Sequence, residues 1–392
     1  MNNNILGHLQ VLLLVAVFSL CAYSYHPRFF DISTGQISNH SIVFVVEILI
    51  LILVLINIWK DEIFDLSMTF FVCLFLIGLL SFGLQTFDYN SSFSECTNMM
   101  PAFLGLHIGA NINIGEKKLF LSLRCYVLCS ILIGLVCIFQ YLGTFVIADQ
   151  YLVAGKNAFG TTLAIAGVIS LYLLIYKQSP KSLKVLDAAS VLIIFIELLT
   201  IRARLASLGF FLVCSILFLR SGLKMRFSFV VTIFLVGALL ALVGFDSFSD
   251  FIYNSFFQNK EADFTSARSD LNLRALEVIY NSPFWGNVDG NHFVDERYQV
   301  HNFLLNKLSH YGVFFSIPWL FLYFEILVYC IKQWIKSNHE SLLVLGCSVM
   351  FVLFWESLGE YTYPFGPGTI TFLPFLVLGY SIMQKKRLNL IP

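Results

Sequence analysis

Charge is scarce in this chain. Of its 392 residues only 12% are Asp, Glu, Lys or Arg, whereas soluble globular domains carry roughly a quarter. Hydrophobic residues make up 58%, and the mean hydropathy is +0.80. Because 24 basic residues balance 24 acidic ones, the chain also lacks the net positive charge that attracts nucleic acid. These shortages exclude an ordinary soluble domain and indicate a polytopic membrane protein.

Cysteine pairs spaced for a metal or redox site are also missing. Of the nine cysteines, only Cys96 lies in a polar segment, and the others fall in apolar runs as small buried side chains do. The first residues, Met-Asn-Asn-Asn, lack the positive charge that begins a signal peptide, so we expect the first apolar run to be retained as a span.

Long apolar runs predict the membrane spans, since about 20 apolar residues cross the hydrocarbon core. The weakest run, 98–114, contains Pro101 and His107 and could instead be re-entrant or lie on the surface. With it, the expected spans are 5–25, 41–59, 66–87, 98–114, 119–143, 158–176, 184–201, 203–220, 227–246, 313–331, 341–359 and 367–383. We therefore predict an all-α polytopic membrane protein with about 12 transmembrane helices.

Basic residues orient these spans. With the amino terminus inside, 14 of the 24 basic residues fall in inner loops, as the positive-inside rule requires. Omitting the 98–114 span would place Lys117 and Lys118 outside and invert every later loop, so we keep it. The short outer loops hold only Arg28, Lys156, Arg202 and Arg204.

One long hydrophilic segment, 247–312, falls on the outer face between the ninth and tenth spans. We expect this loop to be the functional region, between membrane segments 1–246 and 313–392. It concentrates His292, His301, His310, Arg268, Arg274 and Arg297.

Two stretches of this loop have helical spacing. The first, 268–281, places Leu271, Ala275, Val278 and Ile279 on one face and is stopped by Ser282-Pro283, with a turn at Gly286. The second, 301–312, carries an expected apolar stripe of Leu304, Leu305, Leu308 and Tyr311 and ends at Gly312. We expect both to be amphipathic helices on the outer membrane surface, with Arg268 and His301 at the water–lipid boundary.

Charges also lie within or between the spans, where they are costly. Arg202 and Arg204 sit between two apolar runs, so they are expected to face an anion or a carboxylate. The acids within spans are Glu47, Glu197, Glu325, Glu356 and Glu360. Glu197, Glu356 and Glu360 fall near outer ends, which indicates either a polar cavity opening outward or structural pairing with arginines.

Three motifs combine these features. The first is Thr200-Ile201-Arg202-Ala203, with Arg204 as a competing arginine because Arg-x-Ala also fits. The second is Arg268 followed by Ala275, Pro283 and Gly286. The third is His301-Asn302 followed after nine residues by Gly312.

In order, spacing and membrane side, these motifs resemble the O-antigen ligase and O-antigen polymerase superfamily of bacterial envelope enzymes. Asn272 replaces a tryptophan common in that family, and Phe315 replaces a second glycine found in many ligases. The resemblance implies a fold similar to the GT-C glycosyltransferases, in the inner membrane with a periplasmic active site. The implied donor is a glycan on undecaprenyl pyrophosphate, and the acceptor is a lipid A-core sugar in a ligase or a second lipid-linked repeat unit in a polymerase.

The expected chemistry is attack of an acceptor hydroxyl on the anomeric carbon of the donor. A neutral imidazole can take the hydroxyl proton, so His301 is the candidate base. Guanidinium groups bind phosphate oxygens bidentately, so Arg268 and Arg202 are candidates for the leaving group. We expect no metal or other cofactor, because the outer loops hold no carboxylate pair with ligand spacing. The expected substrate-binding residues are Arg204, Arg274, Asn302, Arg297, Glu197 and Glu356.

A glycolipid flippase or other transporter is the alternative from a different class. Transporters concentrate function in broken helices and midplane charges, whereas here only Glu47 and Glu325 lie near the middle of a span. A scaffold protein would explain the topology, but not Arg202, Arg204 and the spaced loop motif.

We predict that Arg268→Ala and Arg202→Ala leave the protein inserted but inactive, and that Arg268→Lys keeps little activity because a lysine cannot bind phosphate bidentately. Glycan display on cells carrying each variant measures this. Near-normal display in both alanine variants would remove these arginines from the mechanism.

Overall fold

A computed structural model describes residues 3–23, 30–31, 36–37, 40–57, 65–83, 89–142, 156–201, 203–222, 268–287, 300–338, 341–366 and 370–389. These residues form 12 helices and one antiparallel pair of two-residue strands, β1 (Phe30–Asp31) and β2 (Gln36–Ile37), with Phe30 opposite Ile37. The predicted all-α class is confirmed.

Helices occupy the expected apolar runs, except 227–246, which lies outside the described residues. They are α1 (Asn3–Tyr23), α2 (His40–Asn57), α3 (Asp65–Gly83), α4 (Tyr89–Asn111), α5 (Glu116–Leu142), α6 (Lys156–Tyr176), α7 (Lys181–Thr200), α8 (Arg204–Arg220), α11 (Phe303–Lys336), α12 (Leu342–Glu356) and α13 (Phe372–Asn389). The first predicted loop helix is α10 (Arg268–Asn281), with the predicted boundaries.

Three of the described helices are long and apolar enough to cross a membrane. They cover Glu116–Phe139, Asn157–Tyr176 and Phe303–Lys336. Shorter apolar helices cover Gly7–Tyr23, Asp65–Leu80 and Leu342–Glu356. The count of 12 spans stays a prediction.

The chain folds into two compact units, each assembled from separated stretches of sequence. The first contains α1, α5 to α8 and most of α2 and α12. The second contains α3, α4, α10, α11, α13 and the turn after α12. The domain boundaries expected at 246 and 312 were placed where the long outer loop begins and ends. The division into compact units does not test them, so they also stay a prediction.

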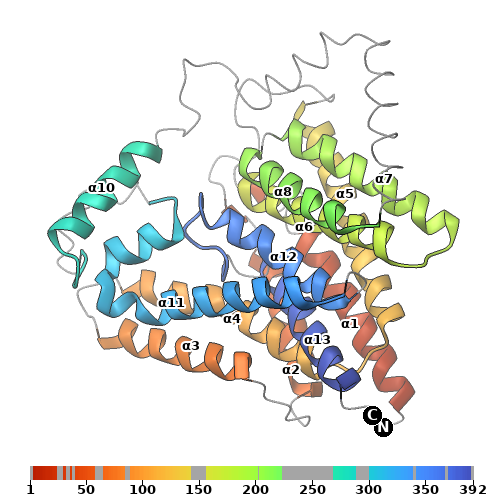
Figure 1. Ribbon diagram of the computed structural model, residues 1–392, viewed down its shortest axis with the longest axis horizontal. Helices are drawn as coiled ribbons and strands as arrows, with labels where there is room; N and C mark the ends of the chain where they lie inside the picture. Colours follow the sequence, from red (N-terminus) through yellow and green to blue (C-terminus); the bar gives the residue numbers. More distant parts are fainter. Residues whose placement is uncertain are drawn as a thin grey trace. The chain divides into compact units, whose positions relative to one another are not determined.

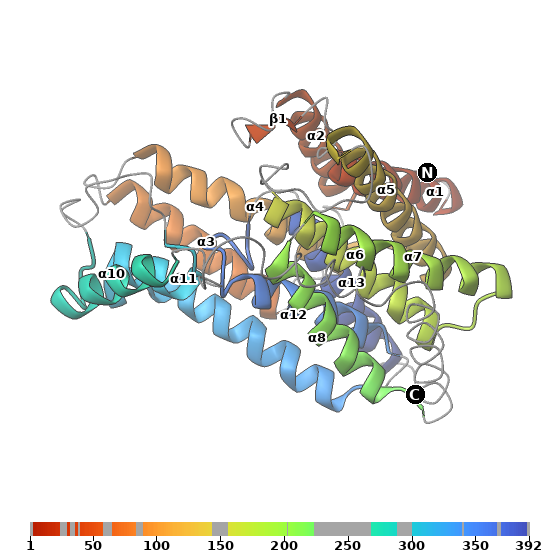
Figure 2. The ribbon, with the colours of Figure 1, turned by 90° about the horizontal axis from the view of Figure 1, so that it is seen from above.

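In the first unit, α5, α6, α7 and α8 pack in one bundle, with α1 along α5 (Figure 2). Small residues allow the close approach of α6 and α8. A Cβ on Gly160 would meet the side chains of Ala203 and Ala206, and one on Gly167 would meet the Phe210 ring.

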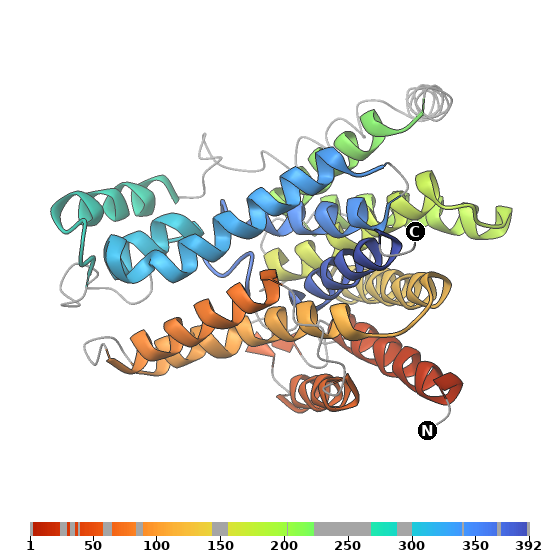
Figure 3. The ribbon, with the colours of Figure 1, turned by 60° about the horizontal axis from the view of Figure 1, so that its bottom comes forward.

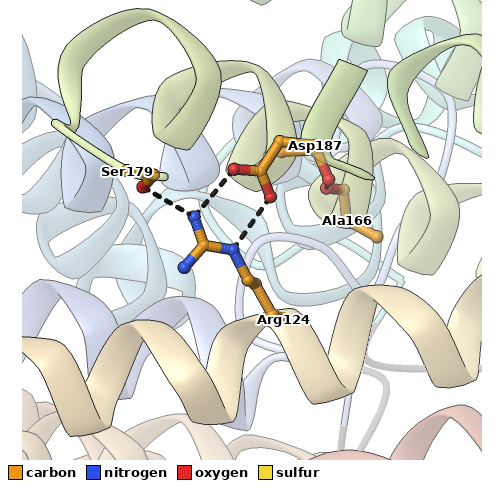
Figure 4. A network of polar contacts seen from close by, with 5 residues as sticks. Arg124, Ala166, Ser179 and Asp187 are labelled. Carbon is orange, nitrogen blue, oxygen red and sulfur yellow. Dashed lines mark hydrogen bonds and ion pairs between the residues drawn. The ribbon is translucent and has the colours of Figure 1, made fainter. Parts of the chain in front are cut away.

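A buried ion pair joins α5 to α7 in this unit (Figure 4). Arg124 Nε donates to Asp187 Oδ1 at 2.9 Å, and its Nη2 donates to Asp187 Oδ2 at 2.7 Å and to Ser179 Oγ at 3.1 Å. The side chains are only 13% and 3% exposed. Removing one partner of such a pair leaves a buried charge and costs about 3–5 kcal/mol, so the bundle requires both residues together.

In the second unit, α3 and α4 run side by side (Figure 3), and α4 packs closely on α13. Gly105 and Gly109 of α4 face the α13 backbone, where an added Cβ would meet the carbonyl oxygens of Phe372 and Leu376, and Gly379 of α13 faces Leu106 in the same way. Small residues permit such backbone contact between helices in membranes. The 98–114 run is therefore a packed helix up to Asn111, and whether it crosses the membrane stays a prediction.

We predict that Gly109→Ala destabilises the protein by about 1–3 kcal/mol, because the added methyl overpacks the contact with α13. Gly78→Ala in α3 is the matched control, since nothing lies within 4 Å of its added Cβ. Thermal unfolding of both variants in detergent measures the difference. Equal midpoints would contradict close α4–α13 packing.

Candidate functional site

The helix α11 folds back on itself at Gly312, whose φ of 64° and ψ of 179° interrupt the helix. Its first segment, 303–311, packs against the residues that follow the bend. The rings of Phe303 and Tyr323 stack with centroids 5.3 Å apart, and those of Tyr311 and Trp319 with centroids 4.6 Å apart. The second predicted loop helix is therefore the first arm of a helical hairpin.

A lysine occupies the inner face of this hairpin. Lys307 is 3% exposed, and its Nζ lies 5.6 Å from the Phe303 ring centroid, 5.7 Å from Tyr311 and 5.5 Å from Trp319. Aromatic faces attract a cation at this range. The arm therefore buries the face that carries residues 303, 307 and 311, and Lys307 lies at its centre.

The apolar stripe predicted for the arm was expected to face the membrane surface. Tyr311 is buried inside the hairpin, and Leu304, Leu305 and Leu308 are half-buried. Periodicity did not reveal the buried position of Lys307, because it treats a lysine as a solvent-facing residue, whereas three aromatic rings surround this one.

Two glycines join α10 to the bend of α11. Both have positive φ, 63° at Gly286 and 64° at Gly312, and a Cβ on either would meet the backbone of the other. Val313 N–H donates to the Pro283 carbonyl at 2.9 Å, and Asn287 N–H donates to the Ser309 carbonyl at 2.9 Å. A side chain at either glycine would push apart the backbone segments around Gly286 and Gly312.

The four apolar residues predicted to share one face of α10 do so, but that face packs on α11 and not on the membrane surface. Ala275 and Val278 are buried, Leu271 and Ile279 are half-buried, and α10 lies along the first arm of α11 (Figure 1). Alanine, proline and glycines at these spacings therefore serve the packing of α10 against α11. In the two loop motifs, Arg268 and His301 are then the residues whose predicted roles are chemical and not structural.

His301 meets a carboxylate that was not among the predicted site residues. Its Nδ1 lies 3.3 Å from Glu360 Oε2, in the turn that follows α12, and the two side chains are 35% and 14% exposed. When Nδ1 donates to a carboxylate, Nε2 is the ring nitrogen that accepts a proton. The only sequence signal for Glu360 was its position as an acid near the outer end of a span.

Asn302 holds His301 at the start of the arm. Its side-chain oxygen accepts from Leu305 N–H at 3.0 Å, which makes it the N-cap of α11, and its Nδ2 donates to the Leu358 carbonyl at 3.2 Å. The next residue, Phe303, donates its N–H to the Ser357 carbonyl at 2.9 Å. The observed contacts of Asn302 thus fix the backbone, and its role in substrate binding stays a prediction.

The predicted arginines of the second unit are described less fully. Arg268 begins α10, but its side chain is outside the described residues, as is the whole of Arg297. Arg274 is exposed on α10.

In the first unit, α7 and α8 are separated by a tight turn. Arg202 lies outside the described residues, and Arg204 is half-buried at the start of α8. Ala203 and Ala206 are buried against Gly160 of α6. The small residues that accompany these arginines are thus explained by packing.

The two acids predicted to bind substrate are both fully buried, each within its own unit. Glu197 lies on Gly134 of α5, and within the described part of the chain neither of its carboxylate oxygens has a hydrogen-bond partner. Glu356 ends α12, next to the turn that binds Phe303. Both side chains are buried within their own units, and the outward polar cavity expected around them stays a prediction.

No protein-family model matches the chain, and no curated protein matches it. Across the described ranges, no group of three or more His, Cys, Asp and Glu side chains is placed to hold a metal ion. The function is therefore argued from the site alone.

We predict that Gly286→Ala and Gly312→Ala each detach α10 from α11, because the methyl has no room and the backbone has positive φ. Chymotrypsin should then cleave faster after Phe284 and Trp285, as mass spectrometry of the fragments would record. Gly115→Ala, whose added Cβ meets nothing within 4 Å, is the control. Wild-type cleavage rates in both variants would be inconsistent with the glycine joint.

Proposed function

We propose that the chain is a membrane glycosyltransferase of the O-antigen ligase type. It would move a polysaccharide from undecaprenyl pyrophosphate to a lipid A-core sugar hydroxyl, at the periplasmic face of a bacterial inner membrane. The observation that supports this most directly is the partly exposed His301–Glu360 pair at the start of α11. A base whose orientation is held by a carboxylate is the arrangement that activation of a hydroxyl requires.

In this mechanism the acceptor oxygen attacks the anomeric carbon of the donor as its proton passes to His301 Nε2. The bond between that carbon and the pyrophosphate oxygen breaks, and undecaprenyl pyrophosphate leaves with the electron pair. Glu360 accepts a hydrogen bond from Nδ1 and stabilises the imidazolium that forms. The carboxylate thereby holds the ring with Nε2 toward the acceptor.

The leaving group gains negative charge as the bond breaks. Arg268 and Arg202 remain our candidates to bind it, with Arg204 and Arg274 in reserve, because guanidinium groups pair with phosphate oxygens in two parallel hydrogen bonds. In this proposal the arginines take the part that a divalent metal plays in other transferases.

A lipid-linked donor also requires an apolar surface for its tail. A groove of about 340 Å³ lies between α3 and α11 of the second unit. Its walls are Met68, Thr69, Val72, Cys73, Leu76, Ile317, Pro318 and Phe321. An apolar groove on a candidate span suits a polyprenyl chain, which supports a lipid-linked substrate.

A polymerase that uses the same donor is the second candidate, because one observation favours it. Phe315 stands where many ligases have a second glycine, and its ring packs against Trp285 with centroids 5.5 Å apart. Cells that lose a ligase keep core without O-antigen, whereas cells that lose a polymerase keep core bearing a single repeat. That phenotype separates the two.

We predict that His301→Gln lowers kcat by about 10²- to 10⁴-fold, since glutamine cannot act as the base. Glu360→Gln should give a smaller loss, because a hydrogen-bond partner remains while the negative charge that stabilises the imidazolium is removed. The measurement is transfer of labelled glycan from a synthetic undecaprenyl donor by purified protein, with core lipid or a second repeat unit as acceptor.

The matched control is Glu277→Gln, which removes an exposed carboxylate from α10. Retention of most of the rate by His301→Gln would end the proposed base role. Absence of transfer to either acceptor by the wild-type protein would reject the transferase itself.

A further inference from the structure

The helix α10 has a second apolar face, which no described segment of the chain covers. Leu273, Leu276 and Tyr280 are 60%, 49% and 87% exposed. At 100° per residue these three side chains fall on one side of the helix, well away from the face of Ala275 and Val278 that packs on α11. An ordinary solvent-facing side would not gather two leucines and a tyrosine.

The same surface continues over the joint between α10 and α11. Phe284, Trp285 and Phe314 are 53%, 57% and 52% exposed. The Phe284 and Phe314 rings stack with centroids 5.3 Å apart, and the Trp285 and Phe314 centroids are 5.9 Å apart. Exposed aromatic side chains thus form a cluster where α10 ends.

Beyond this cluster the apolar surface runs along α11. Ile317, Phe321, Phe324 and Val328 are exposed at helical spacing, in a helix long and apolar enough to cross a membrane. The stripe that a bilayer would cover on α11 is therefore continuous with the cluster and with the second face of α10.

The third face of α10 is polar, with Asp270, Arg274, Glu277 and Asn281 exposed. Over the whole helix, Arg268 and Arg274 balance Asp270 and Glu277, so the sequence of α10 carries no net charge. A helix without net charge is held on a membrane surface mainly by apolar contact, with little dependence on anionic lipid.

We propose that α10 lies in the interfacial layer of the bilayer. Leu273, Leu276 and Tyr280 enter the boundary between headgroups and acyl chains, together with Phe284 and Trp285, and the polar face meets water. Tyrosine and tryptophan concentrate at this depth in membrane proteins. The partner is the phospholipid surface, and this inference does not depend on glycan transfer.

Photo-crosslinking on the full chain tests the proposal. Benzoylphenylalanine is placed singly at Leu276, at Tyr280 and, as the matched control on the polar face, at Glu277. Each protein is reconstituted in nanodiscs of phosphatidylcholine, or of phosphatidylcholine and phosphatidylglycerol in equal parts. We expect roughly fivefold more phospholipid adduct at Leu276 and Tyr280 than at Glu277, with no dependence on the anionic lipid.

Two results would overturn it. Equal lipid adducts at Leu276 and Glu277 would mean that the second face is not in lipid. Adducts of twice the chain mass at Leu276 would mean that a second copy of the protein covers it.

Tryptophan fluorescence gives an independent measurement. In nanodiscs of lipids brominated near the headgroup, the wild-type protein should lose a larger fraction of its emission than Trp285→Phe, because bromine quenches only a nearby indole. Equal fractional losses would place Trp285 outside the interface and contradict the proposal.

Discussion

The second unit depends on the contact between the backbones of Gly286 and Gly312. Each residue has positive φ, and neither has room for a side chain beside the other. The contact bends α11 and joins it to the segment that follows α10 at one point. Because α11 turns back there, its first arm lies against its own longer segment. A methyl group at either glycine would therefore shift α10 relative to the first arm of α11.

The reversal of α11 brings its beginning to the turn that follows α12. There the Asn302 side chain and the Phe303 N–H bind the carbonyls of Leu358 and Ser357, and His301 meets Glu360. Within three consecutive residues, a helix cap, a backbone hydrogen bond and the contact between His301 and Glu360 thus fix the position of the candidate base. In the proposed mechanism this preorganisation would favour proton transfer at His301, since a base must be held within hydrogen-bond reach of its substrate.

Charge is rare in the chain, and two buried sites show how it is accommodated. Arg124 and Asp187 form a bidentate pair between α5 and α7, and Lys307 lies among three aromatic rings inside the α11 hairpin. Both arrangements lower the cost of placing a charge in an apolar interior. The buried Glu197 carboxylate differs from both, since among the described residues neither of its oxygens has a hydrogen-bond partner.

The sequence by itself determined features that depend on neighbouring residues. Apolar runs located the helices, and Ser282-Pro283 ended α10 where the structure ends it. About the candidate site, the sequence identified His301, Asn302 and the two joint glycines, but not Glu360, which pairs with His301 across 59 residues. Only the tertiary structure decided that His301 pairs with Glu360 and that Lys307 points into the hairpin. It also decided that α10 has two apolar faces and a polar one. Periodicity records which residues share a side of a helix, whereas the partner of each side is set by packing between segments far apart in the chain.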